Sequence, residues 1–387
     1  MEWQPWLARW SEEWISSGEP DSLDAEVLRQ RWLGFEAATE SKVAATEQRL
    51  GLALPPSYRS FLLTTDGWRD AGSFVWRMRD TGDLGWVRDL EPHWEESWAE
   101  LCDAGSDDAP GNPFGRGLLI SREADAGILF LDPGDVDADG EWAAYSVFAW
   151  AGDAPTRFPS FAALMEHLYA EFHRMRKPAG QTRDELDLMV ERARLDALAG
   201  DVDAALSALT RADEFGRPRA TLLRVQLLLL LGRSYEADQL LSQLLHPAFI
   251  TEGFLTDPLF TEELMPYLFR QHEIREPWQS SRLEMALIGD PPEIRAAIDA
   301  HEARARHPEY RVTFGSAEFD VAVREALSGP GDPWKHIRAA LPQWQPRTSD
   351  HLAPVVLLAE PALAQSFTPE RGRELLLTPR GDQSRTA

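Results

Sequence analysis

The chain has 387 residues, of which 43% are hydrophobic and 27% charged, a composition typical of a globular protein with room for two domains. No run of about 18 apolar residues is present, and the net charge is −25, so we expect neither a membrane span nor direct binding to nucleic acid. The lone cysteine excludes an internal disulfide, and the N-terminus shows no secretory signal. We therefore expect a cytoplasmic protein.

The first part of the chain mixes helical and strand patterns. Twelve of the fifteen tryptophans precede residue 151. "SKVAATEQRL" predicts a helix capped by Ser41, and "FPSFAALMEHLYAEFHRM" predicts a later helix capped by Ser160. Between them lie four short runs bounded by Gly, Pro and Asp, as strands are: "GSFVWRM", "GRGLLISRE", "AGILFLDP" and "EWAAYSVFAW". Residues 1–176 are thus predicted to form an α+β domain, and "RKPAGQTRDE" a linker.

The segment "TESKVAATEQRLGLALPPSYRSFLLTTDGW" at 39–68 predicts two helices joined by a tight bend, the first of which ends at Leu50. Gly51 suits the end of the first helix, and the double proline suits the start of the second. Tyr58, Phe61 and Leu62 fall at i, i+3 and i+4, which predicts one buried stripe. Asp66-Gly67 is expected to close the second helix, and only Trp68 beyond it is expected to be able to face a partner.

The same region resembles the SUKH superfamily of bacterial immunity proteins and eukaryotic adaptors. The resemblance covers residues 38–175, with a departure in the acidic segment 92–113. The family pattern of a helical Glu, Leu-Gly, Leu-Pro, Tyr, Phe/Leu and Asp-Gly, then Asp-Pro and a Ser-Phe helix, is matched by Glu47, Leu50, Gly51, Leu54, Pro55, Tyr58, Phe61, Leu62, Asp66, Gly67, Asp132, Pro133, Ser160, Phe161 and Leu164. It implies a sheet packed against helices, and a role in binding proteins.

Acidic residues concentrate in one segment of this domain. Residues 80–156 hold 18 acidic and three basic side chains. A solvated, solubility-promoting face is one explanation, and electrostatic steering of a basic protein partner is the other. For the second, the candidate contact residues are Trp68, Asp103, Asp107, Asp108, Asp135, Asp137 and Asp139.

The rest of the chain is predicted to be helical. "RARLDALAGDVDAALSALTRA" and "RVQLLLLLGRSYEADQLLSQLL" place Gly200 and Gly232 at corresponding positions, 32 residues apart. This spacing is similar to that of tetratricopeptide helical hairpins, with a degenerate third hairpin possible in "PEIRAAIDAHEARARHPEY". A generic helical bundle is the equal alternative. We expect a helical domain over 183–345 and a tail over 346–387 that ends in a helix, "PERGRELLL".

Several motifs that suggest chemistry have simpler explanations. Asp135, Asp137, Asp139 and Gly140 match the start of a calcium loop, but Ser146 stands where the bidentate Glu belongs, and strand-like runs flank the segment. A hairpin turn explains it without a metal.

Two histidine groupings, His167 with Glu171 and His173 with Glu166 and Tyr169, could each share a helix face. No third ligand is at hand, so we expect exposed or half-buried helix residues.

No nucleophile elbow or glycine-rich phosphate loop is present, and acidic neighbours disfavour the reactive thiolate of Cys102. We therefore expect a protein without enzymatic activity or cofactor. The favoured interpretation, from the resemblance and the charge, is an immunity protein that neutralises a toxin, often a nuclease, through its acidic surface. An adaptor or regulator unrelated to toxins is the main alternative, and a metal-dependent hydrolase using the acidic loops is a third.

Overall fold

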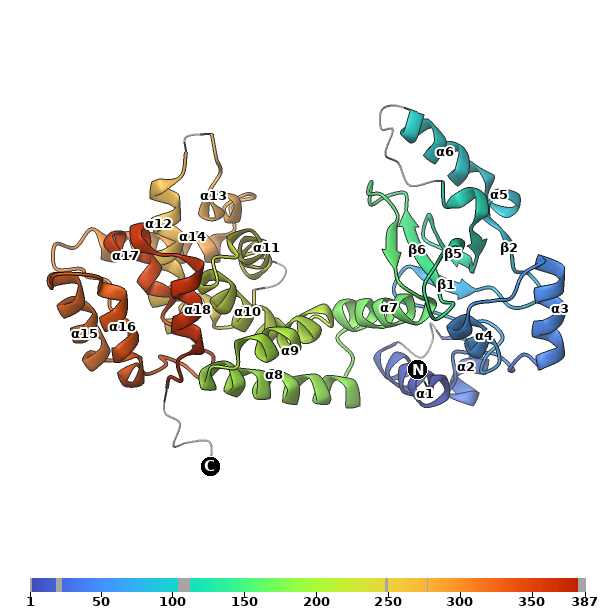
Figure 1. The fold of residues 1–387 in the computed structure, drawn as a ribbon, viewed down its shortest axis with the longest axis horizontal. Helices are drawn as coiled ribbons and strands as arrows, with labels where there is room; N and C mark the ends of the chain where they lie inside the picture. The colour runs from blue at the N-terminus through green and yellow to red at the C-terminus, as the bar shows by residue number, and fades with distance from the viewer. Residues whose placement is uncertain (1, 19–22, 104–111, 248–249, 277, 382–387) are drawn as a thin grey trace. The chain divides into compact units, whose positions relative to one another are not determined.

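The computed structural model describes residues 2–18, 23–103, 112–247, 250–276 and 278–381 (Figure 1). Contacts between residues divide the chain into two compact units, Met1–Asp184 and Glu185–Ala387. The boundary between the units lies after residue 184, whereas the first domain was expected to end at residue 176. Residues 346–387, expected to form a separate tail, belong to the second unit. The first unit combines helices with sheets, and the second is helical, so the predicted change from α+β to all-α is confirmed.

The first unit holds seven helices and seven strands among its described residues. The helices are α1 (Trp3–Ser17), α2 (Ala25–Gln30), α3 (Glu40–Leu50), α4 (Pro56–Leu62), α5 (Val87–Leu90), α6 (Pro92–Asp103) and α7 (Phe161–Arg176). The strands are β1 (Val75–Met78), β2 (Gly85–Trp86), β3 (Leu118–Leu119), β4 (Ser121–Ala124), β5 (Gly127–Val136), β6 (Trp142–Phe148) and β7 (Thr156–Phe158).

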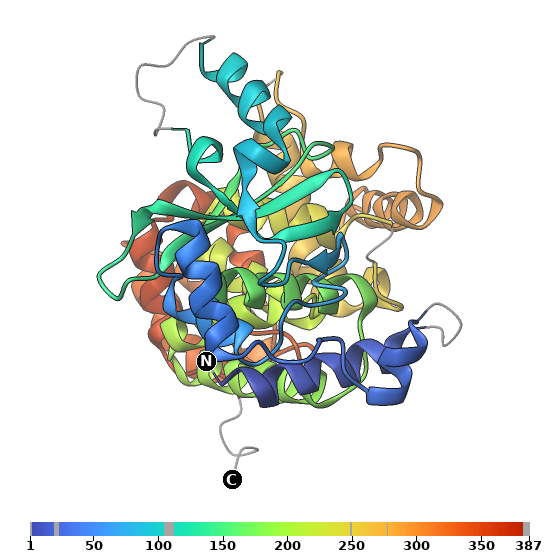
Figure 2. The same ribbon diagram turned by 90° about the vertical axis from the view of Figure 1, so that its right-hand side faces the viewer.

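An antiparallel sheet of five strands, in the order β2-β3-β5-β6-β7, forms the centre of this unit. Strand β1 pairs separately with β4. Successive side chains of a strand point to opposite faces. Ile128 and Phe130 of β5 therefore join the cluster under α5 and α6, while Leu129 and Leu131 point to the other face and are also buried. Figures 1 and 2 show α6 at the end of the unit opposite to α1.

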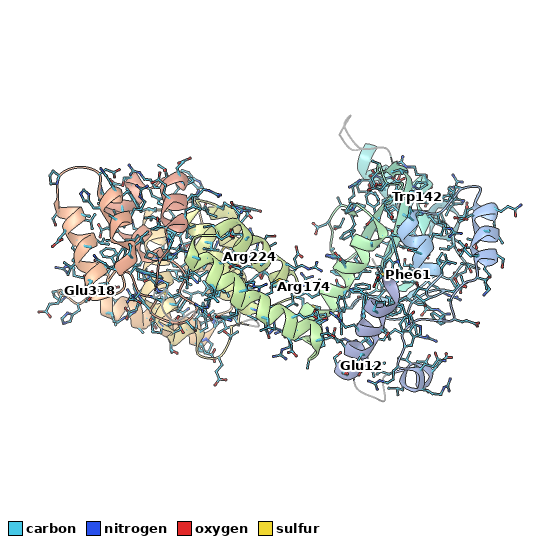
Figure 3. All side chains as sticks on the ribbon, turned by 60° about the horizontal axis from the view of Figure 1, so that its bottom comes forward. Glu12, Phe61, Trp142, Arg174, Arg224 and Glu318 are labelled. Carbon is cyan, nitrogen blue, oxygen red and sulfur yellow. The ribbon has the colours of Figure 1, made fainter. Side chains whose placement is uncertain are left out.

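The predicted helix pair at 40–62 is confirmed. Helix α3 ends at Gly51, whose φ of 78° is a left-handed conformation that glycine adopts at little cost. The Glu47 carboxylate then accepts the Leu54 N–H at 3.0 Å, which holds the bend between α3 and α4. Tyr58, Phe61 and Leu62 are fully buried, as their i, i+3, i+4 spacing predicted. Figure 3 labels Phe61 on α4.

Three local details differ from the prediction. Thr39, not Ser41, caps α3, because its hydroxyl accepts the Lys42 N–H. Helix α4 ends at Leu62, and Asp66 lies in the following turn, where its carboxylate accepts two hydrogen bonds from Thr81. The expected linker is mostly helical, since α8 (Gln181–Ala199) begins within it.

Helix α1 supplies much of the aromatic core of the first unit. Trp3 packs against Phe61 and Phe161, with ring centroids 5.3 and 5.6 Å apart, and Trp14 packs against Phe172 at 4.8 Å. Such aromatic pairs bury large areas and each contribute about 0.5–1.5 kcal/mol beyond that burial. The tryptophan-rich N-terminus is therefore part of the core of this domain.

The second unit is built from helices in its described part. After α8 come α9 (Val202–Glu214), α10 (Pro218–Leu230), α11 (Ser234–Leu244), α12 (Met265–Ile274), α13 (Arg282–Ala286), α14 (Pro292–Ala305), α15 (Ala317–Ser328), α16 (Pro333–Ala340), α17 (Pro361–Ser366) and α18 (Pro369–Leu377). Short 3₁₀ turns are η3 (Phe254–Thr256), η5 (Leu341–Gln343) and η6 (Val355–Ala359), and η4 (Phe260–Leu264) is a π-helical turn.

Two helical hairpins occupy the positions that the repeat pattern predicted. Gly200 joins α8 to α9 and Gly232 joins α10 to α11, both with positive φ. Arg224 of α10, labelled in Figure 3, forms an ion pair with Asp213 of α9. The fully described segment 292–310 holds one helix, α14, so the third hairpin does not form there.

The C-terminal residues are part of the second unit's core. Gln226, the single polar residue in the apolar run of α10, donates to the Asp350 carbonyl at 2.8 Å and accepts the Leu352 N–H at 2.7 Å. The buried Glu263 accepts from Arg347 at 2.7 Å and from the Val356 N–H at 2.9 Å. These two side chains satisfy backbone and charged groups that burial would otherwise leave unpaired.

Glycine makes the contact between α18 and α10 possible. A Cβ on Gly372 of α18 would lie 1.6 Å from the carbonyl oxygen of Leu230 in α10. A Cβ on Gly200, between α8 and α9, would lie 2.5 Å from the carbonyl oxygen of Leu377 at the end of α18. Both distances are far below van der Waals contact. The final helix can therefore pack here only with glycine at these positions.

We predict that Gly372→Ala destabilises the protein. In an unobstructed helix this change would stabilise by about 1 kcal/mol, since alanine is the better helix former. Here the added methyl group forces α18 from α10, and we expect a loss of about 1–3 kcal/mol, as for other overpacked sites. Urea unfolding followed by circular dichroism measures the sign. A variant as stable as the parent or more stable would contradict the packing described.

Candidate functional site

Two tryptophans of the first unit are half exposed. Trp76 of β1 exposes 52% of its surface and Trp150, just after β6, exposes 54%. Both exceed the exposure usual for a side chain of this size and apolarity. They are therefore candidates for contact with a partner.

The aromatic side chains around Trp150 hold it in place. Its ring stacks on Phe148 with centroids 5.3 Å apart and lies 5.0 Å from Phe74, and its indole N–H donates to the Asp125 carbonyl at 3.0 Å. Phe74 directly precedes β1, and Trp76 is the second residue of that strand. We call Phe74, Trp76, Phe148 and Trp150 the aromatic surface.

The sheet register explains why Phe148 lies at this surface. Gly127 of β5 pairs directly with Phe148 of β6. A Cβ on Gly127 would lie 2.1 Å from the Phe148 ring. The absence of a side chain on Gly127 thus lets the ring lie across β5 and support Trp150.

A depression of about 420 Å³ adjoins the aromatic surface. Trp76 and Trp94 contribute apolar lining, and Glu91, Arg122 and Glu123 contribute charge. Arg122 is also paired with Asp83 at 3.2 Å. The depression combines apolar walls with charged groups, and protein interfaces likewise combine an apolar core with a polar rim.

The predicted acidic residues of the β5–β6 hairpin lie around its turn. Asp135 forms a two-point ion pair with Arg157, at 2.6 and 2.9 Å, and this pairing lowers the pKa of the Asp135 carboxyl. Asp137 accepts the backbone N–H groups of Asp139 and Glu141, both at 2.9 Å, and so stabilises the turn. Asp137 and Asp139 are exposed, which leaves them accessible to a basic partner.

Among the predicted contact residues, Trp68 lies where the structure contradicts the prediction. Its side chain is fully buried, with its ring 5.3 Å from that of Trp32 and 5.8 Å from that of Trp10. Because the N-terminal helix covers it, Trp68 belongs to the core, and its expected partner contact is wrong. Asp103 ends α6, and its side chain, like Asp107 and Asp108, lies outside the described residues.

Part of the acidic excess is used within the domain. Asp132 is fully buried and forms a two-point ion pair with Arg116 at 2.5 and 2.8 Å. Glu141 accepts both the N–H and the hydroxyl of Ser57, at 2.8 and 2.6 Å. A count of charges therefore overstates the negative surface that a partner could meet.

A buried cluster that resembles an acid–base site joins α1 to α7. Glu13 accepts from the Tyr169 hydroxyl, from His173 Nε2 at 2.9 Å and from the Thr182 N–H at 2.9 Å. Burial raises the pKa of Glu13, but these hydrogen bonds outweigh it and leave the pKa below its ordinary value. His173 is 3% exposed, so the prediction of an exposed or half-buried histidine is wrong. Since a substrate has no access, we interpret the cluster as structural.

The calcium-like motif forms the hairpin turn that was expected, between β5 and β6. Among the described residues, no three His, Cys, Asp or Glu side chains lie close enough together to hold a metal ion. The same part of the chain has no helix with the length and apolarity needed to cross a membrane.

Comparison with protein families identifies the fold of the first unit. The model of the SMI1 / KNR4 family (SUKH-1) matches residues 37–167, about a third of the chain. Residues 37–167 are thus similar to this family, and we refer to them as the SUKH-1 domain. This match confirms the resemblance found over 38–175, and it includes the aromatic surface and the acidic hairpin of the SUKH-1 domain. No curated protein and no solved structure matches the chain.

Sequence reasoning missed the aromatic surface. "GSFVWRM" and "EWAAYSVFAW" were assigned correctly to strands, but their tryptophans were not distinguished from core residues. The alternation of side chains along a strand could have indicated in part that Trp76 is exposed. Its neighbour Val75 is buried, so Trp76 points to the opposite face. Trp150 follows the end of its strand, where alternation no longer predicts a direction.

We predict that Glu13→Gln destabilises the protein at pH 7 by about 1–3 kcal/mol, the cost of disturbing buried hydrogen bonds to a charged group. Because the folded-state pKa is lowered, this contribution is complete above the ordinary value of 4.5 and is lost as the pH falls through the folded-state pKa. Unfolding in urea between pH 7 and pH 3 should therefore show the gap between parent and variant closing in acid. Glu12→Gln, at the neighbouring exposed position, is the control and should change stability little. A gap that stays constant with pH would show that Glu13 is not ionised in the fold.

Proposed function

We propose that the SUKH-1 domain is a non-enzymatic module that binds a basic protein, and that this partner is a toxin whose activity the chain neutralises. The contact surface is the aromatic surface with the acidic groups beside it. The observation that carries the proposal is the pair of half-exposed tryptophans, Trp76 and Trp150, of which Trp150 is held by the rings of Phe74 and Phe148.

Tryptophans of this kind are the usual anchors of protein interfaces. A few residues provide most of the binding energy at an interface, and Trp is enriched among them. Trp150 is held by ring stacking and by a hydrogen bond, so little side-chain entropy remains to be lost on binding. Its supporting contacts therefore favour a recognition role.

Charge supports a basic partner. The whole chain carries −25, and the surface near Trp76 contributes Glu91 and Glu123. A negative surface raises the association rate of a positive partner and weakens the approach of nucleic acid. A toxin that cleaves nucleic acid carries a basic active site, and an acidic protein surface is suited to cover it.

The family match supports protein binding in general, and toxin neutralisation is the more specific part of the proposal. The alternative is an adaptor that uses the same surface for a partner without toxicity. The two differ in what the partner does to cells when it is expressed without this chain.

We predict that Trp76→Ala combined with Trp150→Ala weakens capture of the partner at least tenfold. The purified chain would be immobilised and exposed to lysate of its native host, and bound proteins quantified by mass spectrometry at two salt concentrations. The control is Trp278→Ala, which removes an 80% exposed tryptophan of the second unit. A partner retained equally by all three proteins would contradict the proposed surface.

The captured protein then decides between toxin and adaptor. Expressed alone in a bacterial host, a toxin arrests growth, and co-expression of the parent chain restores it while the double variant does not. Normal growth without the chain would contradict toxin neutralisation and support the adaptor.

A further inference from the structure

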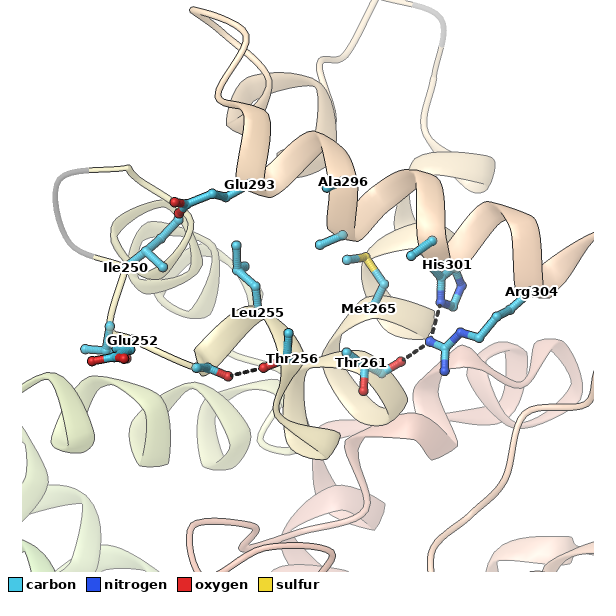
Figure 4. Close-up of a pocket in the computed structure, with 14 residues that line it drawn as sticks. Ile250, Glu252, Leu255, Thr256, Thr261, Met265, Glu293, Ala296, His301 and Arg304 are labelled. Carbon is cyan, nitrogen blue, oxygen red and sulfur yellow. Dashed lines mark hydrogen bonds between the residues drawn. The ribbon is translucent and has the colours of Figure 1, made fainter.

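A second, separate cavity lies within the second unit. It has a volume of about 700 Å³ and is bounded by α14 and by the segment 250–256, as Figure 4 shows. Met265 of α12 and Leu255 of η3 line its apolar part. This volume is within the range of about 300–1,000 Å³ found for ligand sites.

The face of α14 that lines the cavity carries small side chains. Ala296, Ala297 and Ala300 face the cavity, whereas Ile294 and Ile298 of the same helix are buried in the unit. Alanine leaves the space beside the helix free, so a ligand could approach the helix backbone closely. The cavity thus follows from the composition of one helical face.

The two ends of the cavity carry opposite charge. Figure 4 shows Glu252 and Glu293 at the end near Ile250, and His301 and Arg304 at the other end. All of these residues belong to the second unit. A ligand lying along the cavity would therefore meet carboxylates at one end and a cation at the other.

Arg304 is held in position and keeps its charge available. One guanidinium nitrogen donates to the Thr261 carbonyl at 3.0 Å and lies 3.5 Å from His301 Nδ1, while another lies 4.0 Å from Glu262. The Arg304 side chain is 44% exposed. Thr261 belongs to the π-helical turn η4, a distortion frequent at functional sites.

His301 does not add charge to this end at neutral pH. It is 4% exposed and packs against Phe269 with ring centroids 4.5 Å apart, and burial lowers its pKa to about 4. Arg304 also disfavours a second positive charge beside it. Arg304 is therefore the cation that a ligand would meet.

The length of the cavity suits a short extended peptide. Glu293 and Arg304 are three turns apart on α14, roughly 16 Å at about 1.5 Å per residue. Five extended residues span about the same distance at roughly 3.3 Å each. In such a segment the first, third and fifth side chains point to one face.

We propose that this cavity binds an extended peptide segment of the pattern basic–x–apolar–x–acidic. The basic side chain lies between Glu252 and Glu293, the apolar side chain lies against Leu255 and Met265, and the acidic side chain pairs with Arg304. The site is independent of the aromatic surface, so the chain would have a second protein-binding function.

The test uses the full chain and two synthetic peptides of equal composition. Acetyl-Lys-Ser-Leu-Ser-Glu-amide follows the pattern, and acetyl-Lys-Glu-Leu-Ser-Ser-amide places both charges at one end, so that it cannot pair with both ends of the cavity in either chain direction. Isothermal titration calorimetry should give at least tenfold tighter binding for the first. Absence of binding by both peptides, or equal affinity for both, would overturn the proposal.

Variants in α14 test whether the first peptide binds in the cavity. Ala300→Phe fills the space and should abolish binding of the first peptide, whereas Ala303→Phe, at an exposed position of the same helix outside the cavity, should not. Arg304→Glu removes the cation that the acidic side chain pairs with and should weaken binding of the first peptide at least tenfold. Circular dichroism checks that each variant folds. Unchanged binding in the folded Ala300→Phe variant would refute the assigned site.

Discussion

The pairing of β5 with β6 is the constraint on which the candidate surface of the first unit depends. One register places Gly127 opposite Phe148 at one end of the hairpin and the Asp137 turn at the other. A shift by one residue would turn every side chain of the strand to the opposite face. Phe148 would then leave Trp150 without its support, and Phe130 would leave the cluster under α6. The same pairing thus determines both the core and the exposed rings.

The second unit depends on close backbone approach instead. Gly372 allows α18 to contact α10, and Gln226 and Glu263 bind the segment between Asp350 and Val356. The C-terminal residues consequently complete the core around the helical hairpins. In α14, by contrast, Ala296, Ala297 and Ala300 line a cavity. In this unit, glycine therefore permits the close packing of α18 on α10, and alanine leaves space for the cavity beside α14.

Local patterns predicted much of the fold. Helix α3, its glycine stop, the buried stripe of α4 and the Ser160 cap of α7 all follow from a few neighbouring residues, and each was predicted correctly in type. The family resemblance was found for the same reason, because its motif consists of such local signals. The prediction for the cap of α3 failed because two nearby hydroxyl residues, Thr39 and Ser41, are both suitable caps, and the local sequence does not distinguish them.

The candidate site was harder to predict because it depends on distant contacts. Trp68 is buried because α1 and Trp32 cover it, and nothing within its own segment shows that cover. His173 is buried because Glu13, from the other end of the domain, provides a partner. Charge counts also failed to show that Asp132 and Asp135 are neutralised by Arg116 and Arg157.

The central claim is that the aromatic surface is the contact surface for a protein partner. Hydrogen exchange measured by mass spectrometry, with and without the captured partner, tests it most directly. Our account predicts slower exchange in the backbone of residues 74–77, 121–128 and 148–151, which surround Trp76 and Trp150. Protection confined to other parts of the chain, with these three segments unchanged, would contradict it.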